Sequence, residues 1–246
     1  MSKLKCTYQS FGDLAILVEF PPVEDQMALA NLLKLQSHLK NLFQKDLEDL
    51  VFTFNSMCLH FKKAPKLAFI KEKIEHVLRN GSHKAELLFR KHWEIPICFD
   101  LSFCTDLIEH FDGDIEQVAD YQQIICLQDY LLGFYGFMPG FCYLSGLPKD
   151  LAINRKASPS RTTARGSLAV GGRQLGIYPQ DSPGGWCVIG RTPIRFFDPT
   201  KDQPLFAQIG DIISFRPVTL EHYNKLQELV DLGMLPMKNS IYHGDN

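Results

Sequence analysis

The sequence of 246 residues lacks the short motifs that mark a self-contained catalytic or metal site. It contains no P-loop, no G-x-S-x-G and no H-E-x-x-H, and no histidine lies between Phe111 and Glu221. The central part of the chain therefore cannot supply a Ser-His triad or a histidine-based metal site by itself. An ionisable catalytic group there must be Asp150, Asp181, a tyrosine, a cysteine or a lysine, unless a histidine comes from elsewhere in the fold or from another chain.

Other absences limit the class of protein. The seven cysteines are scattered and form no C-x-x-C pair, which disfavours a disulfide framework and a zinc site, so we expect reduced thiols, no metal and a cytoplasmic location. The N-terminus has no apolar signal core, and no run approaches the roughly 20 apolar residues of a membrane span. A net charge of -2 gives no global attraction to nucleic acid.

Glycine and proline gather instead in one stretch, Gly136 to Pro193, which holds ten of the seventeen glycines and six of the fourteen prolines. This density predicts short strands joined by specific turns. The stretch also carries seven basic residues against two acids, a balance that favours an anionic ligand or an acidic partner surface.

The residues before this stretch predict a two-layer unit with the order ββαββα. Strands are expected at 4–8, 14–20, 50–54 and 57–61, and amphipathic helices at 23–43 and from Leu67 to about Asn80. Both helices need a sheet to cover their apolar faces. We place this α+β N-terminal domain at residues 1–84 and a second domain at 85–246.

The second domain is predicted to be a closed β-barrel, because many short strands alternate with Gly/Pro turns. Strands are expected at 93–99, 167–170, 175–178, 187–189, 194–197, 205–206 and 212–216. Asp114 with Gln117 is typical of a helix start. Thr219 can cap a final helix that ends at Gly233. The tail after Pro236 is expected to be loosely held.

Several residues of the central stretch have side chains or backbone suited to binding. Gly184 and Gly185 in Ser182–Trp186 can turn backbone N–H groups toward an anion, with the Trp186 indole as a pocket wall, although a plain covering loop fits the pattern equally well. Arg155 and Arg191 can hold a carboxylate or phosphate, and Gln174 and Tyr178 can offer neutral hydrogen bonds or simply pack the barrel. Gly171-Gly172 favours a hairpin turn, and Cys142 and Cys187 favour buried packing over nucleophilic roles.

These same residues carry a family resemblance. The segments GFMPGFCYLSGLP (136–148), GSLAVGGRQLGIYP (166–179) and SPGGWCVIGRTP (182–193) resemble the signature of the KipI family, also called allophanate hydrolase subunit 1. Its better-defined members are the B-type subunits of prokaryotic 5-oxoprolinase. The resemblance implies that the second domain is a cyclophilin-like β-barrel.

The resemblance also implies an activity: a subunit of an ATP-dependent 5-oxoprolinase, which opens 5-oxo-L-proline to L-glutamate and is active only with partner subunits. The expected partners are a KipA or allophanate hydrolase subunit 2 type subunit and a LamB/YcsF type subunit, with ATP bound jointly. The binding residues would be Arg155, Gln174, Tyr178, Ser182, Gly184, Gly185, Trp186 and Arg191, and no catalytic residue is assigned.

Two other readings stay open: a KipI-like inhibitor of a sensor histidine kinase, and a component of an allophanate hydrolase or urea carboxylase. The chain also departs from the family pattern. Of the two arginines in the PR-x-x-PR motif it keeps Arg155, with Arg161 one position beyond the second. Where VPAGS is usual it has Thr163 to Ser167, which introduces Arg165.

Overall fold

The computed structural model describes residues 6–21, 26–80, 90–234 and 239–242. The chain divides into two compact units, Met1–Leu88 and Phe89–Asn246. The domain boundary expected between residues 84 and 85 lies outside the described residues.

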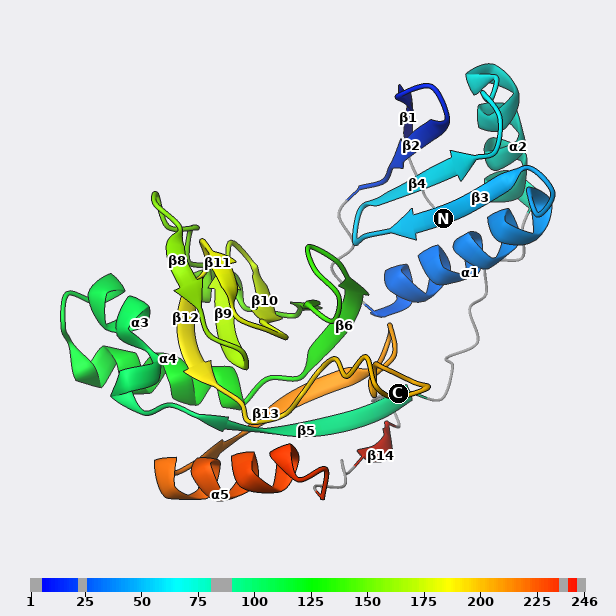
Figure 1. Cartoon of the computed structure of the whole chain (residues 1–246). Helices are drawn as coiled ribbons and strands as arrows, with labels where there is room; N and C mark the ends of the chain where they lie inside the picture. Colours follow the sequence, from blue (N-terminus) through cyan, green and yellow to red (C-terminus); the bar gives the residue numbers. More distant parts are fainter. Residues whose placement is uncertain (1–5, 22–25, 81–89, 235–238, 243–246) are drawn as a thin grey trace. The chain divides into compact units, whose positions relative to one another are not determined.

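The first unit has the predicted order ββαββα (Figure 1). Its elements are β1 (Thr7–Phe11), β2 (Ala15–Glu19), α1 (Gln26–Leu42), β3 (Leu47–Phe52), β4 (Ser56–Phe61) and α2 (Leu67–Asn80). The strands form one antiparallel sheet in the order β1-β2-β4-β3. Two hairpins are therefore joined through their inner strands, β2 and β4.

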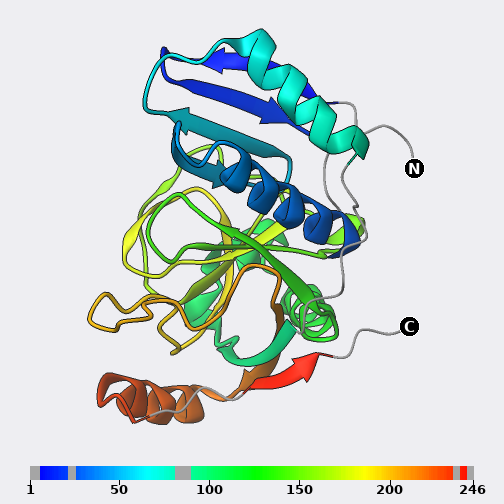
Figure 2. The same cartoon turned by 90° about the vertical axis from the view of Figure 1, so that its right-hand side faces the viewer.

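Both helices cover one face of this sheet (Figure 2). In β2, Ile16 and Val18 are buried while Leu17 is partly exposed, the period-two pattern of a sheet with one covered face. Helix α1 buries Leu29, Leu32, Leu35 and Leu39, which recur at three- and four-residue spacing. The apolar periodicity of the sequence thus selects the contact faces of both layers.

The second unit is built on a closed barrel of seven strands. Its β-elements are β5 (Arg90–Cys98), β6 (Tyr130–Tyr135), β7 (Cys142–Ser145), β8 (Ser160–Thr163), β9 (Ser167–Gly171), β10 (Gln174–Ile177), β11 (Ser182–Gly184), β12 (Cys187–Arg191), β13 (Ile212–Val218) and β14 (Asn239–Tyr242). Strand order around the ring is β12-β9-β10-β7-β6-β13-β5, and pairing of Arg191 with Cys98 closes it. The α+β class with a closed barrel is confirmed.

Side chains alternate between the two faces along each strand, and this alternation determines which residues fill the barrel interior. Leu168 and Val170 of β9 and Leu175 and Ile177 of β10 belong to the main core, whereas Ala169 belongs to a separate cluster on the outer side. The turn between β9 and β10 contains Gly172 at φ +65°, so the predicted hairpin at Gly171-Gly172 is confirmed.

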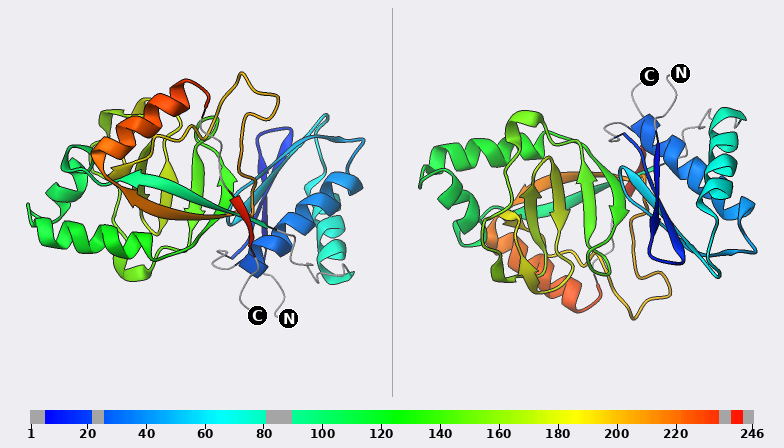
Figure 3. Two further views of the ribbon diagram at one scale, coloured as in Figure 1. Left: turned by 90° about the horizontal axis from the view of Figure 1, so that it is seen from below. Right: turned by 90° about the horizontal axis from the view of Figure 1, so that it is seen from above.

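Helices surround the barrel (Figures 1 and 3). They are the short η1 (Leu101–Phe103) and η2 (Lys149–Leu151), α3 (Thr105–His110), α4 (Ile115–Cys126) and α5 (Leu220–Asp231). Helix α3 packs on β12, α4 on β13 and α5 on β5. The predicted caps are confirmed: Asp114 accepts hydrogen bonds from the amides of Glu116 and Gln117, and Thr219 from that of His222.

Two predicted strands are wrong. Residues 194–197 and 205–206 lie in a loop between β12 and β13. Their apolar side chains fill the core without ladder pairing: Ile194 and Phe196 are buried, and the Phe196 ring packs on Phe206 at 4.9 Å. Pro193 has no amide N–H, and the Ile194 amide bonds the hydroxyl of Thr192 instead of a neighbouring strand.

The expectation of a loose tail is also wrong for residues 239–242. They form β14, which pairs antiparallel with the outer side of β5. Residues near a chain end are often poorly ordered, but here the unpaired edge of β5 offers them a ladder of backbone hydrogen bonds. These bonds order residues 239–242. Within the described ranges, no helix is long and apolar enough to cross a membrane.

Candidate functional site

Four aromatic rings gather on the outer surface of the barrel, over β7, β9 and β10. Phe141, Tyr143, Tyr178 and Trp186, hereafter the aromatic cluster, meet edge-to-face or tilted. The centre of the Trp186 ring lies 5.6 Å from those of Phe141 and Tyr143, and Phe141 lies 5.0 Å from Tyr178. Such contacts fix the orientation of each ring, so the cluster offers a rigid apolar wall.

Two glycines of the predicted signature make room for this wall. A Cβ on Gly171 would come within 2.4 Å of the Trp186 ring, and one on Gly176 within 2.6 Å of the Phe141 ring. Neither glycine has a positive φ, so space alone explains the absence of a side chain. The rings lie directly on the strand backbone there.

Arg155 supplies charge at the exposed side of the cluster. Its guanidinium carbon lies 5.6 Å from the centre of the Trp186 ring, within the range of a cation–π contact. Burial raises the pKa of both Tyr143 and Tyr178, and the charge of Arg155 partly opposes this. Tyr178 therefore stays a neutral hydroxyl at physiological pH, beside a cation at the solvent-facing edge.

The predicted glycine loop runs past the Tyr178 hydroxyl. Gly184 is so close that a Cβ there would lie 2.5 Å from both the Tyr178 oxygen and Thr163 Oγ1. The backbone of Trp186 hydrogen-bonds the Tyr178 oxygen and lowers its pKa against the larger effect of burial. Thr163 Oγ1 is buried and has no hydrogen-bond partner among the described residues.

The loop is fixed by contacts that the sequence did not reveal. Lys156 Nζ lies 2.8 Å from Asp106 Oδ2 of α3, and the same oxygen accepts a 3.0 Å hydrogen bond from the Val188 amide. The Lys156 amide donates to the Gly185 carbonyl at 2.7 Å. Fifty residues separate the ion pair in the sequence, and no local motif indicates it. It holds the Arg155 segment over Gly185 and Trp186.

Five of the eight candidate residues are thus brought together: Arg155, Tyr178, Gly184, Gly185 and Trp186. Gln174 pairs with Gly171 across the hairpin, and by strand alternation it points to the same outer side as Tyr178. Ser182 pairs with Thr163, and its hydroxyl bonds the carbonyl of Pro183, at 3.3 Å.

Arg191 lies elsewhere. It ends β12, whereas Trp186 directly precedes that strand, and β12 spans about 13 Å at about 3.3 Å per residue. Its guanidinium carbon lies 4.3 Å from the centre of the Phe103 ring. Five of the eight candidates are therefore brought together, whereas Arg191 lies apart, because a β-strand carries its two ends far apart.

The cysteines of barrel strands β7 and β12 are not activated as nucleophiles. Cys142 and Cys187 are thiols without a disulfide, and burial raises the pKa of each to about 12, so neither thiol is activated. Within the part of the chain that the structure describes, no three His, Cys, Asp or Glu side chains come together as metal ligands. Phe141, Tyr178 and Trp186 are buried, so the group that the cluster offers to an anionic ligand is the exposed Arg155, which the Trp186 ring supports.

A match to a known family covers most of the sequence. Residues 6–207 match the family described as carboxyltransferase domain, subdomain C and D. The chain belongs to this family. The resemblance to the allophanate hydrolase subunit 1 type is confirmed.

Among similar proteins, the B-type subunit of 5-oxoprolinase from Bacillus subtilis is 35% identical over 142 residues, 56% of this chain and 58% of that protein. The Haemophilus influenzae protein of the same name is 45% identical over 133 residues, 51% of this chain and 59% of its own length. The matches thus span less than two thirds of these relatives. The crystal structure of the K. lactis urea amidolyase has a TM-score of 0.79 at 21% identity, covering 98% of this chain and 16% of that one, which shows a shared fold.

Proposed function

We propose that this chain is a subunit of an ATP-dependent 5-oxoprolinase, which converts 5-oxo-L-proline to L-glutamate. The observation that carries the proposal is the 35% and 45% identity to two proteins named as the B-type subunit of 5-oxoprolinase. The aromatic cluster with Arg155 suits such a substrate, because 5-oxoproline is a small flat lactam with one carboxylate.

The reaction needs coupling, since lactam opening in water is unfavourable. ATP transfers its γ-phosphoryl group to the lactam oxygen and ADP leaves. Water then adds to the activated carbon and the C–N bond opens, which releases the amine and leaves γ-glutamyl phosphate. A second water hydrolyses this acyl phosphate to the carboxylate of glutamate and free phosphate. The chain has no P-loop, so the nucleotide is bound jointly with partner subunits of the KipA and LamB/YcsF types in a cytoplasmic complex.

In this complex the described residues bind and orient. Arg155 pairs with the substrate carboxylate, Trp186 holds Arg155 in place through the cation–π contact, and the neutral Tyr178 hydroxyl donates a hydrogen bond to an oxygen atom of the lactam or of the phosphoryl group. Gln174 and Ser182 contribute further hydrogen bonds at the edge, and the amides of Gly184 and Gly185 stabilise developing negative charge.

Reconstitution tests the proposal. The isolated chain is expected to show no 5-oxoproline-dependent ATP hydrolysis, and addition of both partner subunits is expected to restore it. Robust activity of the chain alone would rule out the shared site. A complex that hydrolyses allophanate instead of 5-oxoproline would favour the urea amidolyase relationship, and inhibition of a sensor kinase by the chain alone would favour a regulatory function.

A further inference from the structure

Three arginines converge at the end of the barrel covered by α5. Arg165 precedes β9, Arg191 ends β12, and Arg195 follows in the loop that leads away from it. Arg165 and Arg195 reach Asp231 at the end of α5, whereas Arg191 and Arg165 both act on the pKa of Tyr223 in the same helix. We call Arg165, Arg191 and Tyr223 the α5 cluster.

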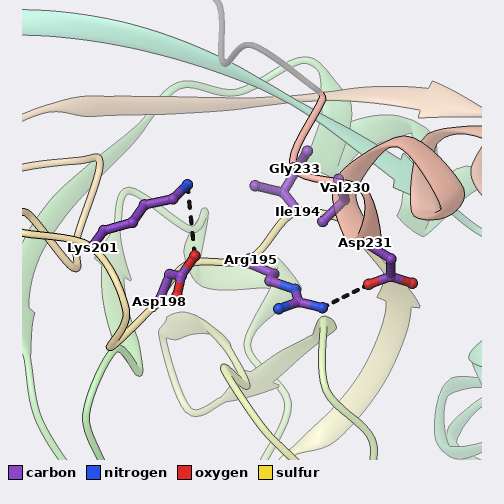
Figure 4. A pocket seen from close by; sticks show the side chains of 7 residues that line it. All are labelled: Ile194, Arg195, Asp198, Lys201, Val230, Asp231 and Gly233. Carbon is purple, nitrogen blue, oxygen red and sulfur yellow. Dashed lines mark hydrogen bonds and ion pairs between the residues drawn. The ribbon is translucent and has the colours of Figure 1, made fainter.

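The acidic side chain at this place is already taken by Arg195. Asp231 Oδ1 accepts a 2.7 Å hydrogen bond from Arg195, and Oδ2 accepts one of 3.0 Å from Gln227. The pair borders a hollow of ≈ 200 Å³ in which Lys201 also pairs with Asp198 (Figure 4). Both cations that line the hollow, Arg195 and Lys201, therefore have their own carboxylate.

Arg165 and Arg191 have no such partner at hydrogen-bond distance. The nearest carboxylate oxygen to Arg165 Nη2 is that of Asp231, at 3.9 Å, beyond hydrogen-bond range. Among the residues that the structure describes, Arg191 forms no ion pair, and both Arg191 Nε and Arg165 Nη1 are buried without a hydrogen-bond partner. Within these described residues, Arg165 thus has only a long ion pair with a carboxylate that Arg195 already occupies, and Arg191 has a side-chain contact with the Tyr223 hydroxyl but no anion.

Two neighbouring arginines with unsatisfied N–H donors are unfavourable unless a ligand accepts hydrogen bonds from them. A buried charged donor that is left unsatisfied has lost its water without compensation, and like charges close together add to that cost. A bound oxyanion removes both penalties, because two guanidinium groups can donate several parallel hydrogen bonds to one carboxylate or phosphate.

The neighbouring rings hold the arginines in position for this. The Arg191 guanidinium stacks 4.3 Å from the centre of the Phe103 ring, and Phe103 in turn packs on Tyr223 at 5.1 Å. Burial raises the pKa of Tyr223, so its hydroxyl stays protonated and can donate, although Arg191 and Arg165 oppose this shift. The contact from this hydroxyl to Gln227 Oε1 is long, at 3.5 Å.

We propose that the α5 cluster is an oxyanion-binding site in which Arg165 and Arg191 bind one carboxylate or phosphate group with help from Tyr223. The site lies at the opposite end of β12 from the aromatic cluster, and it does not depend on the proposed function.

Binding to the isolated full chain tests the proposal. Phosphate, acetate and L-glutamate are titrated separately at constant ionic strength, by calorimetry and by NMR of the arginine Nε–Hε signals. We expect saturable binding of at least one anion that shifts the Arg191 signal. Phosphate alone would identify a phosphoryl ligand, and acetate with glutamate would identify a carboxylate. Absence of saturable binding by all three would overturn the proposal.

Variants separate a built site from general charge. Arg165→Gln and Arg191→Lys are each expected to weaken binding at least tenfold, the first by removing one cation and the second by losing the planar fork. Arg216→Gln is the control, because this exposed arginine pairs with Glu94 on another part of the barrel and its loss changes net charge equally. Unchanged affinity in Arg165→Gln would show that this arginine only braces α5. Equal weakening in Arg216→Gln would show that anions respond to net charge alone, and either result would overturn the proposal.

Discussion

Arg155 lies over the Trp186 ring at 5.6 Å, and the segment that carries it is tied down one residue later by Lys156. The cation is therefore exposed but not loose. The backbone next to it is fixed to the Gly185 carbonyl, and its charge reaches the hydroxyls of Tyr143 and Tyr178. This relationship places an anion-binding group at the edge of a rigid aromatic wall, and the first prediction follows from it.

We expect Arg155→Lys to lower kcat/KM of the reconstituted complex roughly tenfold to a hundredfold, because loss of a charge-assisted hydrogen bond costs about 1.5–3 kcal/mol. The melting temperature of the isolated chain should barely change, since the side chain is exposed. Arg216→Lys is the matched control and should keep full activity. Normal turnover in Arg155→Lys would remove this residue from the site.

The second prediction concerns the room that glycine leaves under the aromatic cluster. Gly176→Ala is expected to destabilise the chain by about 1–3 kcal/mol, because its Cβ meets the Phe141 and Trp186 rings and forces them to move. Urea unfolding and the Trp fluorescence maximum measure the two effects. Gly185→Ala is the control, since the nearest atom to its Cβ is 3.7 Å away and stability should change little. Equal stability of the two variants would mean that the rings are not packed on β10.

The third prediction uses the buried thiols. Burial raises the pKa of Cys142 and Cys187 from 9.0 to about 12 in the folded chain, so the unfolded chain loses these protons first as the pH rises. Their contribution to stability is complete below about pH 9 and is lost between about pH 9 and 12, at about 1.4 kcal/mol per pH unit for each group. The buried Tyr121 and Tyr130, whose pKa values are also raised, act in the same direction.

Urea unfolding at pH 8, 9.5 and 10.5 checks this dependence. The free energy of unfolding should fall with pH in the wild type and fall less steeply in the Cys142→Ala variant, whatever that substitution costs at pH 8. Identical slopes for the two proteins would show that Cys142 titrates normally and that the barrel interior admits water.

Local patterns in the sequence determined much of the fold. The sequence predicted strands at 167–170 and 175–178 with a turn at Gly171-Gly172, and Asp114 and Thr219 marked two helix starts correctly. These features can be predicted from the sequence because each depends on neighbours within a few residues. The concentration of glycine in Gly136–Pro193 likewise located the stretch that builds the aromatic cluster, through turns and close backbone packing.

Tertiary structure alone decided which distant segments meet. Asp106 and Lys156 hold the site together across fifty residues, and nothing in either local sequence predicts the pair. Arg191 is only five residues from Trp186 in the sequence, but the extended strand β12 separates them. Tyr223 of helix α5, from the C-terminal part of the chain, lies near Arg191 instead. Ile194 and Phe196 are apolar like strand residues, yet the barrel closes without them through the pairing of Arg191 with Cys98, so they fill the core from a loop.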